Sequence, residues 1–120
     1  MSRYIHLPIF QKGSELNLEI YQTTHNFPRE YKYSLGQKMK EIASELLDCI
    51  IITNSKEDKQ LYFSEIKIRI ERLRIHLRVS YDLKIITSKR IEFLNRILEE
   101  ISKQVSGWEK WFLENFKKEI

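Results

Sequence analysis

The segment 64–84, SEIKIRIERLRIHLRVSYDLK, constrains the fold of this chain more than any other stretch. If the segment is helical, its apolar side chains fall into two stripes on roughly opposite faces, because each residue turns the helix by about 100°. A helix in a small monomeric bundle needs only one buried face. We therefore expect one stripe to face the core of the chain and the other to face another subunit. The predicted core stripe is Ile66, Ile70, Leu73, Leu77 and Tyr81, and the predicted oligomer interface is Leu61, Ile68, Ile75 and Val79.

The same segment also alternates between apolar and polar residues, which is typical of a half-buried strand. On that alternative, Ile66, Ile68 and Ile70 share one face of the strand, but Arg72 and Arg74 then fall on the same face. A regular strand keeps its apolar phase unless a bulge interrupts it. The change of phase at Leu73 therefore favours the helix.

Cations separate the two apolar stripes. Between Ile66 and Arg90 there are eight cations and only two acids, which is a local net charge of +6 in a chain whose overall charge is +4. Concentrated positive charge attracts phosphate groups. The predicted nucleic-acid-binding residues are Lys67, Arg69, Arg72, Arg74, Arg78, Lys84, Lys89 and Arg90. The alternative is a solvated surface that happens to be rich in Lys and Arg.

Ion pairs within the helix compete with phosphate binding, because acids and cations three or four residues apart are neighbours on a helix. The possible local pairs are Glu65 with Arg69, Glu71 with Lys67 or Arg74, and Asp82 with Arg78. Arg72 and Lys84 have no local partner. No element that could read base edges is visible, so we expect recognition of the nucleic-acid backbone or shape.

Helical periodicity extends along the rest of the chain. The predicted helices span about 8–25, 34–53, 56–83 and 88–106, and residues 107–118 form a docked tail or extend the last helix. Gly13 leaves open whether the first helix begins at Pro8 or Ser14. Ser34 and Gln37 have the spacing of a capping box. Four amphipathic helices with short connections predict an all-α, up-and-down four-helix bundle in one domain, 1–120.

The last predicted helix carries a cation at every seventh residue. These residues are Lys89, Arg96, Lys103, Lys110 and Lys117. A track for phosphates would have this form, but Glu92 and Glu99 precede Arg96 and Lys103 by four residues, the favourable spacing for ion pairs. We therefore favour an ordinary solvated face for this stripe.

No catalytic or metal-binding pattern is recognisable in the sequence. His6, His25 and His76 have no carboxylate or cysteine at a metal-ligand spacing, and there is no Gly-rich phosphate loop or nucleophile elbow. We expect a non-enzymatic protein without cofactor or metal. The single cysteine, Cys49, lies among apolar residues and reads as a buried thiol in a reducing compartment. With no long apolar run and no signal peptide visible, we expect a cytoplasmic protein without a membrane span.

Several short motifs, in order, resemble the accessory variability determinant (Avd) proteins of diversity-generating retroelements. The matching residues are Phe27–Arg29, Tyr33–Lys38, Ala43–Leu47, Arg69–Arg74, Leu77–Lys84 and the pair Gly107-Trp108. The resemblance extends from about Leu16 to Trp108. The four-helix-bundle proteins encoded in 23S ribosomal RNA intervening sequences are broader relatives. Their small-residue stretch at the end of the second helix is replaced here by 48–53, DCIIIT, which favours the retroelement branch.

The resemblance implies a function that residue spacing could not provide. Avd proteins are four-helix bundles that assemble into a barrel-like pentamer with a basic surface. They bind the reverse transcriptase of the retroelement and nucleic acid, and they support mutagenic copying of a template RNA into cDNA. The implied partners of this chain are therefore a reverse transcriptase, RNA or DNA, and further copies of itself. The family offers no catalytic residues to transfer.

Overall fold

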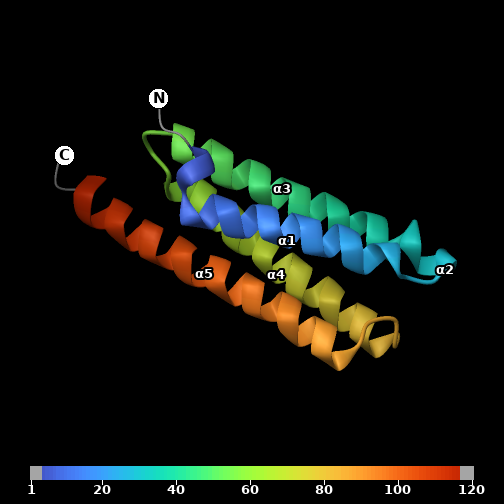
Figure 1. Cartoon of the computed structure of the whole chain (residues 1–120). Coiled ribbons are helices and arrows are strands. Elements are labelled where there is room, and N and C mark those ends of the chain that lie inside the picture. The colour runs from blue at the N-terminus through green and yellow to red at the C-terminus, as the bar shows by residue number, and fades with distance from the viewer. Residues whose placement is uncertain (1–3, 117–120) are drawn as a thin grey trace.

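The computed structural model describes residues 4–116, which form helices and loops and no strand. Four long helices, α1 (Pro8–His25), α3 (Leu35–Ser55), α4 (Gln60–Asp82) and α5 (Ser88–Phe116), run up and down along a body of about 53 × 23 × 21 Å (Figure 1). A short 3-10 helix η1 (Tyr4–His6) precedes α1, and the one-turn helix α2 (Arg29–Lys32) joins α1 to α3. The prediction of an all-helical bundle is confirmed.

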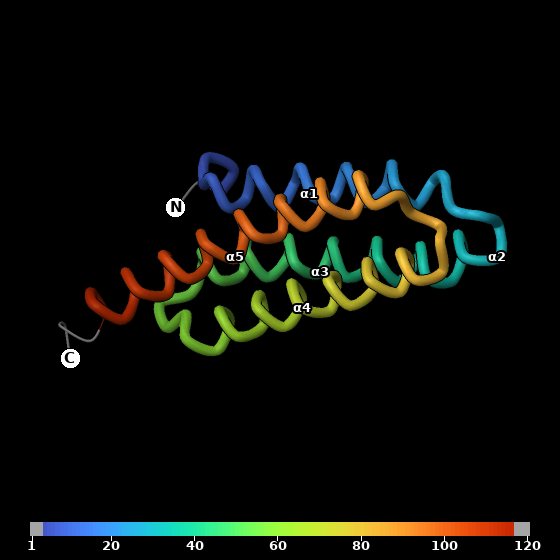
Figure 2. The backbone as a smooth tube through the Cα atoms, turned by 90° about the horizontal axis from the view of Figure 1, so that it is seen from below, coloured from blue at the N-terminus to red at the C-terminus, as the bar shows by residue number. Residues whose placement is uncertain are grey.

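The helices form a four-cornered bundle in which α1 and α4 occupy opposite corners. Helix α1 packs against α3 and α5, and α4 packs against the same two helices. Figure 2 shows α1 and α4 on opposite sides, with α3 and α5 between them. Helix α2 and the loop between α4 and α5 lie at one end of the bundle, while the loop between α3 and α4 lies at the other (Figure 1). Like α3 and α5, the helices α1 and α4 each have an outer face that points away from the core, and these two faces lie on opposite sides of the bundle (Figure 2).

The core of the bundle consists mostly of the predicted apolar positions. In α4, Ile66, Ile70, Leu73 and Leu77 are buried, as expected. Tyr81 is not in the core and is 41% exposed. Its place is taken by the fully buried Ser80, whose hydroxyl donates a hydrogen bond to the His76 carbonyl at 2.8 Å. Because the Ser80 side chain is small and its hydroxyl is hydrogen-bonded within α4, the last turn of α4 can pack against Met39 of α3.

One predicted helix cap and one predicted helix start differ from the structure. The Ser34 hydroxyl donates to the Glu30 carbonyl at 3.1 Å and does not cap α3, and the Gln37 amide contacts Glu41, so the predicted capping box is absent. Helix α4 begins at Gln60, four residues after the predicted start at Lys56. The intervening residues instead close the end of α3, because the Lys59 ammonium donates to carbonyls of that end.

The last helix is the longest and continues through Gly107. A Cβ at Gly107 would meet no atom within 4 Å, so the glycine is accommodated on an open face of the helix. Beyond it, Trp108 and Phe112 pack edge-on against the buried Phe63 of α4, with ring centroids 5.4 and 5.7 Å away. Of the two alternatives for 107–118, the helix extension is observed as far as Phe116. Residues 117 and 118 lie outside the described part of the chain.

Candidate nucleic-acid interface

The outer face of α4 carries the predicted interface stripe. Leu61 is 67% exposed, Ile68 51%, Ile75 61% and Val79 42%. We call these four residues the outer α4 stripe. Their exposure in the single chain is what an interface with another subunit requires, and their role there remains a prediction.

On the side of α4 that faces α5, acids from both helices pair with the predicted phosphate-binding cations. Lys67 forms an ion pair with Glu109 of α5. Arg74 contacts Glu71 of its own helix at 2.5 Å and Glu99 of α5 at 3.1 Å. Only the pair with Glu71 could be read from helical spacing, because the other two acids come from a different helix.

On the side that faces α3, a second group of ion pairs is centred on Glu45. The Arg69 guanidinium contacts Glu65 at 2.6 Å and Glu45 at 3.3 Å, and Arg72 contacts the same Glu45 oxygen at 3.4 Å. The hydrogen bond to Glu65 is the main reason that the pKa of Arg69 is raised further above its ordinary value. Arg72, which lacks a partner in its own helix, finds one in α3.

The ion pairs on both sides of α4 neutralise the cations along most of this helix. The segment 39–77 contains seven cations and seven acids, so it has no net charge. A phosphate that approaches the middle of α4 meets carboxylates beside every guanidinium. The local count of +6 between Ile66 and Arg90 therefore overstates the positive potential along this helix.

Near the turn between α4 and α5 the predicted residues divide into paired and unpaired cations. Arg78 contacts Asp82 at 3.1 Å. Arg90 is held in place by α1, because its Nε donates to Thr23 Oγ1 at 2.9 Å and a terminal nitrogen contacts the Glu19 carboxylate at 2.5 Å. Lys84 and Lys89 are exposed and form no ion pair with any residue in 4–116.

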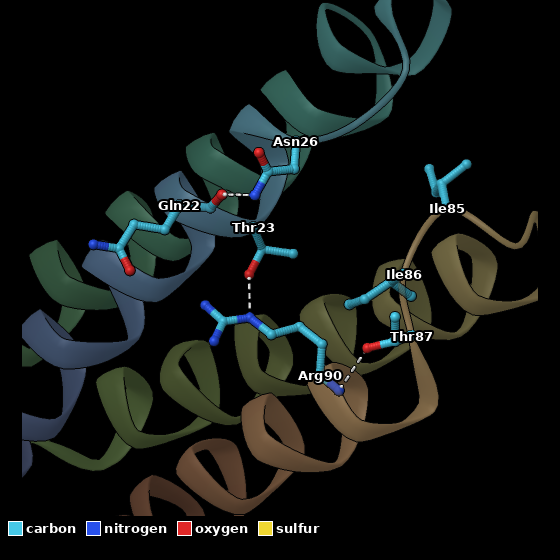
Figure 3. A pocket seen from close by; sticks show the side chains of 7 residues that line it. All are labelled: Gln22, Thr23, Asn26, Ile85, Ile86, Thr87 and Arg90. Atoms are coloured by element: carbon cyan, nitrogen blue, oxygen red, sulfur yellow. Dashed lines mark hydrogen bonds between the residues drawn. The ribbon is translucent and has the colours of Figure 1, made fainter.

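Arg90 also borders a surface cavity of about 430 Å³ between the end of α1 and the turn (Figure 3). The other lining residues are Gln22, Thr23, Asn26, Ile85, Ile86 and Thr87. The Thr87 hydroxyl accepts the Arg90 backbone N–H at 3.1 Å and thereby caps α5. Arg90 thus connects the turn between α4 and α5 to α1. Sequence spacing did not predict this structural role, because Thr23 and Glu19 are far from Arg90 in the chain.

Three further cations lie at the same end of the bundle and were missed by the sequence argument. Arg29 and Lys32 belong to α2, and Lys38 lies in the first turns of α3. None of the three forms an ion pair within the described residues. They are 40 or more residues from Lys84 in sequence, so a local charge count could not group them with it.

Metal binding has no candidate site among the described residues. No group of three or more His, Cys, Asp or Glu side chains lies close enough together to hold a metal ion within 4–116. His76 Nδ1 is 2.7 Å from the Arg72 carbonyl of its own helix. None of the helices in this part of the chain has the length and apolar character needed to cross a membrane.

Comparison with known proteins agrees with the motifs. A family model described as bAvd-like matches residues 7–112, which is nearly the whole four-helix bundle. A comparison with curated proteins gives no match. The matched range includes all four long helices up to the aromatic contacts between α4 and α5. This chain therefore belongs to the bAvd-like family, in agreement with its resemblance to the Avd proteins.

Proposed function

We propose that this protein is a non-enzymatic accessory factor of a diversity-generating retroelement. It binds the reverse transcriptase of the element and its template RNA or cDNA in the cytoplasm, and it supports mutagenic cDNA synthesis. Family membership over residues 7–112 is the observation that carries the proposal. The arrangement of apolar and charged side chains on the bundle supports two parts of it, self-assembly and nucleic-acid binding.

Self-assembly is favoured by two exposed apolar faces at opposite corners of the bundle. One is the outer α4 stripe. The other consists of Leu18 and Tyr21 on α1, which are 57% and 54% exposed, and we call this pair the outer α1 stripe. Exposed apolar residues that gather on one face, rather than occurring singly, mark contact sites.

Two different faces favour a ring over a simple dimer. A two-fold dimer uses the same patch on both subunits, whereas contact between two different patches is repeated from subunit to subunit and closes into a ring when the rotation allows. In our proposal the outer α1 stripe of one subunit packs against the outer α4 stripe of the next. This would produce the barrel-like homo-oligomer, a pentamer by resemblance.

Nucleic-acid binding is supported by exposed cations, such as Lys84 and Lys89, that have no acidic partner among the described residues. Binding through phosphates releases counterions, so the affinity should fall steeply as salt is raised. No base-reading element is evident, so we expect little dependence on RNA sequence.

The function is tested with purified components. The protein is mixed with the reverse transcriptase of the retroelement and with the template RNA, and the mixture is analysed by size-exclusion chromatography and by cDNA synthesis. We expect all three to elute together and cDNA yield to depend on this protein. Elution apart from the polymerase, with unchanged cDNA yield, would contradict the proposal. If the protein then still bound RNA, it would instead resemble the intervening-sequence bundles, and if it bound neither it would be a structural oligomer.

A further inference from the structure

Net charge is distributed very unevenly along the long axis of the bundle. The segments 26–38 and 78–90 together contain seven cations and two acids, which is a net charge of +5, whereas the whole chain has only +4. These two segments include α2, the first turn of α3, the last turn of α4 and the start of α5. Both lie at the same end of the molecule (Figures 1 and 2). We call this surface the basic end.

Five of the seven cations at the basic end form no ion pair with a described residue, whereas Arg78 pairs with Asp82 and Arg90 with Glu19 of α1. Arg29, Lys38, Lys84 and Lys89 are exposed, and no acid in 4–116 pairs with them. By contrast, Lys67, Arg69, Arg72 and Arg74 along the middle of α4 share five carboxylates. An approaching phosphate would have to compete with those carboxylates along α4 but not at the basic end.

Local structure disfavours two of these cations, Lys38 and Lys89. Lys89 is the second residue of α5 and Lys38 the fourth of α3, and the amino end of a helix disfavours positive charge. The first turns of α3 and α5 contain no acid that would offset this. A phosphate bound beside such helix ends would remove the unfavourable interaction.

Lys84 follows the carboxyl end of α4, where positive charge is favourable, but its backbone conformation is unusual. It has a φ of 63°, the only positive value at a non-glycine residue among those described. Its N–H donates to the Tyr81 carbonyl and the next N–H, of Ile85, donates to the Ser80 carbonyl, which is the hydrogen-bond pattern that ends a helix at a left-handed residue. Glycine is the usual residue there because a side chain is strained at this φ. The chain keeps a lysine where glycine would be more stable.

The cations that recur at every seventh residue of α5, which we call the α5 stripe, are the main alternative site for phosphate binding. Arg96, Lys103 and Lys110 are exposed and also lack acidic partners in the described residues. However, the segment 91–116 contains three cations and five acids, so its net charge is −2. These cations lie in interior turns of α5, away from its amino end, where positive charge is not opposed by the helix dipole.

We propose that the basic end is the surface that holds the sugar–phosphate backbone of RNA. This inference rests on the proposed nucleic-acid-binding function and assigns it to Arg29, Lys32, Lys38, Lys84 and Lys89. In a ring whose axis runs along the bundles, rotation keeps equivalent ends on the same side. All basic ends would then line one rim, and an RNA strand could contact several of them at once.

The experiment compares two triple variants with the same loss of charge. The first, Lys38→Ala with Lys84→Ala and Lys89→Ala, changes the basic end. The second, Arg96→Ala with Lys103→Ala and Lys110→Ala, changes the α5 stripe. Binding of a fluorescein-labelled single-stranded RNA is measured by anisotropy across a salt series. For the first variant we expect roughly 50-fold weaker binding at 0.15 M salt and a salt slope lower by about 2, from the counterion release of three lost phosphate contacts.

The α5 variant is expected to bind within about twofold of the unaltered protein, since it loses no phosphate contact. Equal weakening by both variants would mean that net charge alone matters, and it would overturn the assignment, as would stronger weakening by the α5 variant. If the unaltered protein binds no RNA even at low salt, the nucleic-acid part of the proposed function fails, which is a distinguishable result.

A single substitution separates binding from folding. Lys84→Gly should raise the midpoint of thermal unfolding, because glycine is unstrained at this φ. It should also weaken RNA binding about fourfold at 0.15 M salt, from one lost phosphate contact. Lys84→Gly protein that is more stable and binds RNA with unchanged affinity would remove Lys84 from the site.

Discussion

At the residue scale, Lys59 closes the carbonyl end of α3. Its ammonium donates to the carbonyls of Thr53, Asn54 and Lys56 at 2.9, 3.3 and 2.5 Å, and burial lowers its pKa. The last carbonyls of a helix have no partner within the helix and interact favourably with a cation. This side chain therefore stabilises both the end of α3 and the path of the loop into α4.

Replacing Lys59 should destabilise the bundle. Lys59→Met keeps most of the apolar stem but removes three hydrogen bonds from a charged donor, so we expect the free energy of unfolding to fall by about 1–2 kcal/mol. Urea denaturation followed by circular dichroism measures this. Lys110→Met, at an exposed position, should change the free energy by less than about 0.5 kcal/mol. Equal effects of the two substitutions would show that the three carbonyl contacts contribute nothing.

The half-buried thiol of Cys49 should react slowly. Burial raises the pKa of Cys49, although nearby Arg69 acts in the opposite direction. Only the thiolate reacts readily, so alkylation by iodoacetamide should be slower in the folded protein than in urea at the same pH. Because the folded pKa is raised, stability is retained below the ordinary thiol pKa and falls as pH rises above it. A reaction rate with its midpoint at or below the ordinary pKa would contradict this.

Helical spacing predicted some of the ion pairs on α4 but not all of them. The pairs Glu65–Arg69, Glu71–Arg74 and Arg78–Asp82 are separated by three or four residues, and all three are observed. The roles of Glu45, Glu99 and Glu109 could not be foreseen, because they depend on how α3 and α5 are rotated against α4. Those three acids neutralise cations along the length of α4 and leave the unpaired cations at its end.

At the element scale, the glycines within α1 and α5 have opposite surroundings. A Cβ at Gly13 would lie 3.0 Å from Leu47 Cδ1 and 3.1 Å from Ile50 Cδ1, so this glycine lets α1 approach α3 closely. Gly107 has no neighbour within 4 Å of that position. Helical periodicity predicted both helices, but only packing shows which glycine is needed.

The two glycines should therefore respond differently to alanine. Gly107→Ala should raise the free energy of unfolding by about 0.5–1 kcal/mol, because alanine favours the helix. Gly13→Ala has the same helical advantage but forces Leu47 and Ile50 to move, so its gain should be smaller or absent. Urea titrations at one protein concentration provide the comparison. Equal gains at both positions would show that α1 and α3 have room to spare.

At the scale of the whole molecule, the bundle has two apolar faces at opposite corners and a charged end. Hydrophobic patterning predicted the outer α4 stripe. The sequence alone does not separate the outer α1 stripe from the core, because Leu18 and Tyr21 stand close to the buried Leu16 and Ile20 in the chain. Which face of a helix points to the core and which to solvent depends on how the helices pack in the bundle.

Ring assembly predicts that two defective variants restore one contact between them. Ile68→Glu with Ile75→Glu removes the α4 face, and Leu18→Glu with Tyr21→Glu removes the α1 face. Each variant alone should be a folded monomer, and their mixture should form a one-to-one dimer, as judged by light scattering and circular dichroism. Trp111→Glu, an exposed position in neither stripe, should leave the assembly intact. A full assembly formed by the α1-face variant would instead indicate contact between two α4 faces.

The most direct test of the account is the solution mass of the unaltered protein, measured by light scattering with and without a single-stranded RNA across a salt series. We predict an oligomer that binds RNA at low salt and releases it steeply as salt is raised. A monomer that ignores RNA at every salt concentration would contradict both the paired apolar faces and the basic end.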